Sequence, residues 1–296
     1  MDLNERDIDD WPGHGLTDAE LDAAYNVRAL AGEERFGHLM ARYRAMSDAA
    51  VEGLPGHPGI VYDETGGERL DVWGPGRDGE ARPVFVFLHG GYWRALSRAD
   101  SAFMARTLHR NGVATVVPDY TLAPAATLEE IVRQVRAAVA WVHRHGRAHG
   151  LDPGRVVVGG SSAGGHLTAM TMLDGWQAEF GLPGDAVRAA MPFSGLFDLR
   201  PLTRVYVNEW LGLDVRRAAA LSPELLPAGR SLPAVVAVAE HDGPGFLQQS
   251  RRFARHWGRA AELMVVPDRD HFDVVLDLAD ERSAVSRALL ALVHSL

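Results

Sequence analysis

The sequence predicts an α/β fold in which eight strands form a mostly parallel sheet with helices on both faces. Apolar runs without internal charges, such as Pro83–Leu88 and Val156–Val158, are typical of strands buried on both faces. The later six strands alternate with helical segments, and such alternation produces parallel strands joined by crossover helices. Because the 296 residues contain no linker-like stretch and no internal repeat, we expect a single domain.

The predicted elements begin with a helical arm and a hairpin. The arm, Thr17–Met46, opens with Thr17 and Glu20 at the spacing of a capping box. The β-rich stretches Gly59–Glu64 and Arg69–Trp73 predict a hairpin at a sheet edge. The later strands are expected at Pro83–Leu88, Val113–Val117, Val156–Val158, Ala186–Phe193, Pro233–Ala239 and Ala261–Val266. The main helices are expected at Asp100–Arg110, after Thr127, from Ala163 to about Leu173, and at Phe246–Trp257 and Arg282–Leu292.

Two segments fall outside this alternation. Residues 1–55 precede the sheet, and residues 194–231 are too long for a simple connection. The second segment contains Tyr206 and Trp210, and we expect a helix to start at Ser222-Pro223-Glu224. Both segments are expected to form a small helical cap over the carboxyl ends of the strands, where sheets of this kind bind ligands.

Gly160-Ser161-Ser162-Ala163-Gly164 has the G-x-S-x-G pattern of a nucleophile elbow. The predicted strand before it and helix after it supply the context that this motif needs, so the pattern predicts an α/β-hydrolase fold with Ser162 as the nucleophile. Glycines on either side let the strand and the helix approach closely. The strained turn then exposes the serine hydroxyl at a helix N-terminus.

A serine nucleophile needs a base, and the histidine that serves as base is held in one tautomer by a carboxylate. In an α/β-hydrolase the acid and then the histidine follow the serine along the chain. His271 follows the last predicted strand, whereas the other downstream histidines lie beside the serine, beside the acid, or in or after helices. Asp242, just beyond the preceding strand, is the preferred acid, and Glu240 is the alternative.

The developing oxyanion of acyl transfer needs hydrogen-bond donors. One is expected from the N–H of Ala163, the residue after the nucleophile. The others are expected from the loop after the Pro83–Leu88 strand, where glycines let the backbone turn its N–H groups inward. We assign these donors to Gly91 and Tyr92.

Composition excludes several kinds of chemistry. The chain has no cysteine and no lysine, which excludes disulfides, thiol catalysis, thiolate metal sites, Schiff bases and a phosphate-binding loop of the Walker type. The formal charge of −9 argues against a nucleic-acid partner. His143, His145 and His149 are interpreted as cations at a helix C-terminus rather than as metal ligands, and Gly159–Gly165 lacks dinucleotide-binding spacing.

These observations also predict the substrate class, cofactors, partners and location of the protein. We expect a small-molecule substrate, no metal and no cofactor. No apolar segment is long enough to span a bilayer, and the N-terminal residues are acidic, so a cytoplasmic protein without a membrane partner is expected. A homodimer is left open.

The chain resembles the kynurenine formamidase (arylformamidase) branch of the α/β-hydrolases, which is related to the hormone-sensitive-lipase-like esterases. The motifs that carry the resemblance are His89-Gly90-Gly91-Tyr92-Trp93, Gly164-Gly165-His166-Leu167, Ser194-Gly195-Leu196-Phe197-Asp198-Leu199 and His271-Phe272-Asp273. The likeness extends from Tyr25-Asn26 nearly to the C-terminus. Two positions depart from the family pattern: Ser161, where relatives usually carry His, Glu or Asp, and Ala239, where glycine is common.

The resemblance implies hydrolysis of an aryl formamide, with N-formylkynurenine as the family substrate and formate and the free amine as products. Trp93, Tyr206, Trp210 and Phe272, together with Tyr92 and Phe197, are candidates for an aromatic wall around the aryl group. The alternative is a carboxylesterase acting on small-acyl esters through the same steps. A more remote alternative is a non-catalytic binding protein with the hydrolase fold, although all three predicted triad residues are present.

Overall fold

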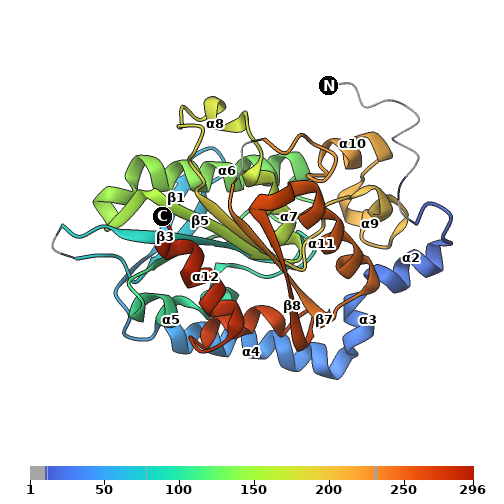
Figure 1. The fold of residues 1–296 in the computed structure, drawn as a ribbon, viewed down its shortest axis with the longest axis horizontal. Coiled ribbons are helices and arrows are strands. Elements are labelled where there is room, and N and C mark those ends of the chain that lie inside the picture. Colours follow the sequence, from blue (N-terminus) through green and yellow to red (C-terminus); the bar gives the residue numbers. More distant parts are fainter. Residues whose placement is uncertain (1–10, 12, 78, 230–231) are drawn as a thin grey trace.

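A single eight-stranded sheet forms the centre of the protein, in the order β1-β2-β4-β3-β5-β6-β7-β8 (Figure 1). The computed structural model describes residues 11, 13–77, 79–229 and 232–296. The strands are β1 (Gly56–Asp63), β2 (Glu68–Trp73), β3 (Arg82–Leu88), β4 (Ala114–Pro118), β5 (Leu151–Ser161), β6 (Ala189–Phe193), β7 (Ala234–His241) and β8 (Ala261–Asp270). β1 and β2 pair antiparallel at one edge, as the sequence predicted, and β3 to β8 are mutually parallel.

Alternating side chains of the strands supply both layers of the core. In β3, Val84, Val86 and Leu88 belong to one hydrophobic cluster, and Phe85 and Phe87 belong to the other. This alternation follows from the two-residue period of a strand, and it explains why the run is apolar throughout. The predicted α/β-hydrolase sheet, mostly parallel and buried on both faces, is confirmed.

Helices cover both faces of the sheet (Figure 1). The first face carries α6 (Leu128–His145), α7 (Ala163–Met172) and α11 (Pro244–Trp257), and the second carries α4 (Glu33–Val51), α5 (Ala105–Arg110) and α12 (Ala284–His294). The shorter helices are α2 (Asp18–Tyr25), α3 (Val27–Ala31), α8 (Trp176–Glu179), α9 (Asn208–Leu211) and α10 (Val215–Ala220). The 3-10 turns are η1 (Arg98–Asp100), η2 (Gly146–His149), η3 (Arg200–Arg204), η4 (Gly258–Ala260) and η5 (Val274–Ala279).

The N-terminal arm is divided into three helices rather than one. The expected capping box is present, since the Thr17 side chain and Glu20 bond reciprocally. The first break falls at Asn26, whose side chain accepts a hydrogen bond from Ala29 N and so caps a new helix. The second falls at Gly32, where φ is +79°. These breaks lead the chain from α2, which packs on α11, to α4 on the other side of the sheet (Figure 1).

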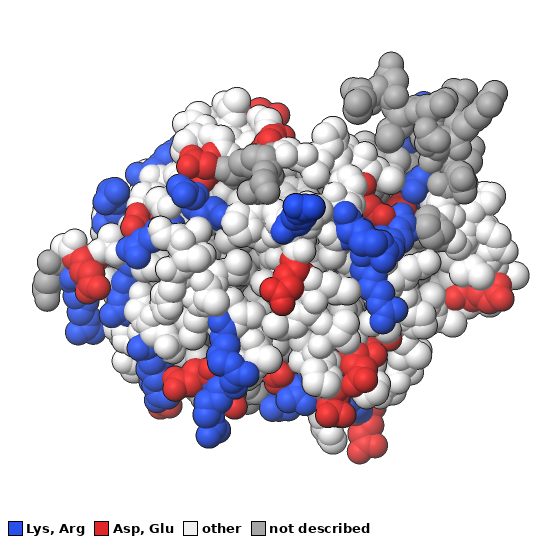
Figure 2. All heavy atoms as spheres, in the orientation of Figure 1, with Lys and Arg blue, Asp and Glu red and all other residues white. Residues whose placement is uncertain are grey.

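The helix predicted to start at Ser222 is absent from this described segment, which forms a turn instead. The Ser222 hydroxyl donates to Ala218 O and accepts from Leu199 N. It therefore connects the end of α10 to the backbone at Leu199. Among the described residues, no helix combines the length and the apolar composition needed to cross a bilayer. Acidic and basic side chains are interspersed on the face shown in Figure 2.

Candidate active site

Ser162 occupies the sharp turn between β5 and α7. Its φ of 59° and ψ of −116° are strained for a residue with a side chain. The close packing around the turn explains the flanking glycines, because a Cβ on Gly160 would lie 2.5 Å from Leu88 O and one on Gly164 would lie 1.9 Å from the same oxygen. The turn therefore has the geometry of a nucleophile elbow, and Ser162 lies at the N-terminus of α7.

His271 and Asp242 form a buried hydrogen-bonded pair beyond the ends of the last two strands. Nδ1 of His271 lies 2.8 Å from Oδ1 of Asp242, and that oxygen also accepts the N–H of Gly243 at 2.7 Å. A carboxylate at Nδ1 keeps the proton on that nitrogen and leaves Nε2 free to accept one. The ring of Phe246 packs against the imidazole at 4.4 Å between centroids, which restricts its rotation.

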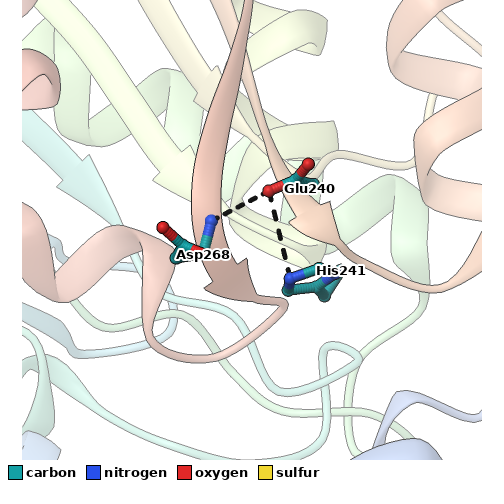
Figure 3. Close-up of side chains that lie close together, drawn as sticks. All are labelled: Glu240, His241 and Asp268. Atoms are coloured by element: carbon teal, nitrogen blue, oxygen red, sulfur yellow. Dashed lines mark hydrogen bonds and ion pairs between the residues drawn. The ribbon is translucent and has the colours of Figure 1, made fainter.

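Glu240, the alternative acid, lies beside Asp268 and His241 (Figure 3). Its carboxylate accepts the backbone N–H of Asp268 at 3.0 Å and lies 3.9 Å from Nε2 of His241. The side chains of these three residues are exposed. The structure thus brings Asp242, and not Glu240, to His271.

One cavity of about 610 Å³ contains the predicted machinery. Ser162 and His271 both line it, together with Gly91 and Tyr92. Within the described part of the chain, the Ser162 hydroxyl forms no hydrogen bond with the imidazole. Catalytic hydrogen bonds often form or tighten only when substrate is bound. The placement of both side chains in one cavity is therefore compatible with a serine–histidine pair in the free enzyme.

The loop after β3 offers backbone donors to this cavity. Gly91, Tyr92 and Trp93 have φ values of 93°, 48° and 57°. The tight turn is closed by Arg94 N and Ala95 N, both of which bond to Gly91 O. The N–H groups of Gly91 and Tyr92 form no hydrogen bond with any other described residue, which leaves them available as donors.

Ala163 has its N–H in the first turn of α7, where no intrahelical acceptor exists. Its position beside Ser162 is the one that the elbow motif assigns to an oxyanion donor. Ala163 is fully buried, so its N–H lies in a desolvated setting. All three predicted donors are therefore near the nucleophile turn or in the cavity wall.

The predicted aromatic wall is present only in part. Tyr206, Trp210 and Phe272 line the cavity, as does Tyr92. The substrate-binding prediction for Trp93 is wrong, because this side chain is 0% exposed, lies outside the cavity and packs edge-on against His166 at 5.2 Å. The positive φ of Trp93 accompanies its burial in the core.

Phe197, also considered for the wall, is another core residue. Its ring stacks on Phe253 with centroids 4.1 Å apart and planes within 4°. Ser161, by contrast, lines the cavity beside the nucleophile. Ser161, one of the two positions singled out in the sequence analysis, therefore faces the cavity.

The sequence analysis expected the arm in a cap but named none of its residues as part of this wall. Phe36, Met40 and Tyr43 of α4 line the cavity, and Phe36 packs edge-on against Phe272 at 5.2 Å. These three residues recur at a spacing of four and three positions, which places them on one helical face. The spacing predicts that the three side chains share one face of the helix. It does not indicate whether that face packs on the sheet or lines a cavity.

The comparisons with known proteins agree with this geometry. Residues 70–205 match a family model described as BD-FAE. Kynurenine formamidase of Danio rerio is 32% identical to the chain, over 97% of the chain and 99% of the relative. The chain belongs to the kynurenine formamidase family.

Solved structures support the fold of this kynurenine formamidase family member. A protein from Silicibacter sp. TM1040, described provisionally as a thioesterase, matches with a TM-score of 0.79 and 31% identity over 93% of this chain and 99% of that one. A hyperthermophilic esterase from Pyrobaculum calidifontis matches with a TM-score of 0.71 at 22% identity, over 88% and 93% of the two chains. The predicted family is confirmed, and the protein is a serine hydrolase of the arylformamidase or esterase kind.

Proposed function

We propose that the protein is an arylformamidase that hydrolyses N-formylkynurenine, or a closely related aryl formamide, to formate and the free arylamine. The observation that carries this proposal is the whole-length relationship to kynurenine formamidases, joined to a cavity that holds Ser162 and His271 within an aromatic wall. In this proposal Ser162 is the nucleophile, His271 is the general base and acid, and Asp242 orients the imidazole.

The reaction proceeds in two halves. Nε2 of His271 takes the proton of the Ser162 hydroxyl as Oγ attacks the formyl carbon. The tetrahedral oxyanion is stabilised by the N–H groups of Gly91, Tyr92 and Ala163. His271 then protonates the departing amine nitrogen, and the C–N bond breaks to leave a formyl ester on Ser162. Water, deprotonated by His271, hydrolyses this ester and releases formate.

The proposed cap supplies apolar and aromatic side chains for the aryl group of the substrate. Val27, Phe36, Met40 and Tyr43 come from the arm within residues 1–55, and Tyr206 and Trp210 come from the insertion at 194–231. With the formyl carbon at Ser162, the aryl group faces these aromatic and apolar side chains, which favour flat rings. We propose that the two segments act together as a cap over the site.

The experiment that tests this function compares kcat/KM for N-formylkynurenine with kcat/KM for phenyl acetate. An arylformamidase should prefer the formamide, and Ser162→Ala should lower kcat by about 10⁶ if the triad acts as a unit. The variant should unfold at the same urea concentration as the wild type. Turnover by folded Ser162→Ala close to the wild-type rate would exclude Ser162 as the nucleophile.

A carboxylesterase is the second candidate. The observation that favours it is the 36% identity, over 43% of this chain, to a carboxylic ester hydrolase of Mycobacterium tuberculosis. The same steps serve an ester, except that the leaving oxygen needs less assistance from a proton than an amine nitrogen does. Preference for the aryl ester by a factor of 100 or more would favour this candidate, and labelling by a fluorophosphonate is expected for both.

A further inference from the structure

The described wall of the active-site cavity contains arginines but no acidic side chain. Two arginines, Arg28 and Arg94, line it. Among the described residues of the wall there is no Asp or Glu, although the whole chain carries a formal charge of −9. A partly enclosed wall of this kind attracts anions, because apolar surroundings screen charges less than water does.

Arg28 is already neutralised by a carboxylate. Its guanidinium donates to Glu33 through Nε at 2.9 Å and through Nη2 at 2.6 Å. It also lies over the ring of Phe36 at 4.8 Å from the centroid. This bidentate pair occupies the edge of the guanidinium that would otherwise receive a substrate carboxylate.

Arg94 has no such partner. Its guanidinium forms no ion pair and no hydrogen bond with any described residue. The central carbon lies 4.5 Å from the ring centroid of Trp210, so the cation rests on the face of the indole. This contact restrains the guanidinium, and its N–H groups, which no described residue engages, are free for a planar acceptor.

The chain holds this cation close to the reacting centre. Nε1 of Trp210 donates a 3.1 Å hydrogen bond to Tyr92 O, in the loop that offers the proposed oxyanion donors. Arg94 follows Tyr92 by two residues, so their Cα atoms lie no more than about 7 Å apart. A substrate with its acyl carbon at Ser162 and its ring against Trp210 would thus extend its far end toward Arg94.

We propose that Arg94 binds a carboxylate on the leaving-group side of the substrate and makes the enzyme selective for anionic aryl substrates. The inference rests on the proposed function for the place of the acyl carbon. It adds that negative charge, as well as aromaticity, determines which substrates are accepted. A carboxylate matches the two parallel N–H donors of a guanidinium.

The test uses two pairs of substrates that differ only in charge. The first pair is N-formylkynurenine and its α-carboxamide, and the second is 3-acetoxybenzoate and 3-acetoxybenzamide. Wild-type kcat/KM should favour the anion of each pair by about tenfold, through KM, because the ion pair is partly exposed to water. Arg94→Gln should remove this preference, with the loss falling on the KM of the anion. Sodium chloride at 0.5 M should also reduce it.

Two further variants separate Arg94 from general charge effects. Arg282→Gln removes one positive charge from a side chain that is 87% exposed and outside the cavity wall, so the preference should persist. Arg28→Gln tests the other cavity arginine. Loss of the preference in Arg28→Gln but not in Arg94→Gln would overturn the proposal, as would a wild-type enzyme that does not distinguish the members of either pair.

Failure of the proposed function would look different. If neither formamide is hydrolysed but the esters are, the formamidase assignment fails and the ester pair still measures the charge preference. Binding supplies a readout that needs no turnover: calorimetry on Ser162→Ala should show kynurenine binding about tenfold more tightly than its carboxamide. Equal binding of the two, or a difference that survives Arg94→Gln, contradicts the role of Arg94.

Discussion

The Tyr92 hydroxyl donates a 2.6 Å hydrogen bond to the carbonyl oxygen of Tyr25, 67 residues earlier in the chain. This bond ties the loop after β3 to the end of α2 in the arm. Trp210 Nε1 holds the same residue from the insertion, through Tyr92 O. Because Tyr92 has a φ of 48°, the loop depends on such contacts to keep a conformation that is unfavourable for a residue with a side chain.

Tyr92→Phe should therefore weaken both folding and catalysis. Loss of the bond should lower the free energy of unfolding by about 1 to 2 kcal/mol, since the partly buried Tyr25 carbonyl loses its donor. A small displacement of the backbone donors should lower kcat by about tenfold, with less effect on KM. Urea unfolding and steady-state kinetics on N-formylkynurenine measure the two effects. Tyr206→Phe is the control for stability, because that hydroxyl has no hydrogen bond within the described residues.

Asp242→Asn should lower kcat by about 10⁴ while leaving the fold intact. An amide can donate to Nδ1 and so favour the wrong tautomer of His271, in which Nε2 carries the proton and cannot act as a base. Glu240→Gln is the matched control, because Glu240 bonds to the backbone N–H of Asp268 on the surface. It should change kcat by no more than about twofold. A larger loss in Glu240→Gln than in Asp242→Asn would reverse the assignment of the acid.

The sequence sufficed to predict the sheet and the pairing of Asp242 with His271, because both follow from local patterns. Apolar runs mark strands, and the order of serine, acid and histidine is set by the topology of the fold. The choice of Asp242 over Glu240 rested on which residue lies beyond the strand. In the structure β7 runs to His241, so Asp242 is the first residue past its end.

Side-chain direction at irregular backbone could not be predicted. Trp93 follows two residues of the cavity wall, yet its φ of 57° accompanies a side chain packed in the core against His166. Such φ values are rare for residues other than glycine, and sequence patterns do not indicate them. The breaks of the arm at Asn26 and Gly32 were missed for a related reason, since helical periodicity continues across both.

Phe36→Ala should raise KM for N-formylkynurenine by about tenfold, with a smaller effect on kcat. The side chain belongs to the arm but packs edge-on against Phe272 in the cavity wall, so its loss removes apolar contact area from the proposed aryl site. Steady-state kinetics measure the change. Leu30→Ala is the control, because Leu30 lies in the same arm, is 59% exposed and does not line the cavity. Equal KM values for Phe36→Ala and the wild type would remove the arm from the substrate site.

Stability should fall as the pH falls from about 6.5 to about 4, in part because of His166. Burial lowers the pKa of His166 to about 4, with a smaller contribution from the positive charge of Arg136. Nε2 of the neutral ring bonds to Leu221 O at 2.8 Å. Between these pH values the unfolded state binds a proton that the folded state does not, so protonation favours unfolding. The effect amounts to at most about 3 kcal/mol at pH 4.

His166→Gln should flatten this part of the stability curve. A glutamine amide can still donate to Leu221 O but does not titrate, so the variant loses the pH dependence even if it is less stable at every pH. Urea unfolding at intervals from pH 4.5 to 7.5 gives the slope, which a uniform loss of packing would leave unchanged. His38→Gln, at an exposed position, should keep the wild-type slope. If His166→Gln keeps it as well, the proton uptake belongs to another buried group, and the first to examine is His89, whose pKa burial also lowers.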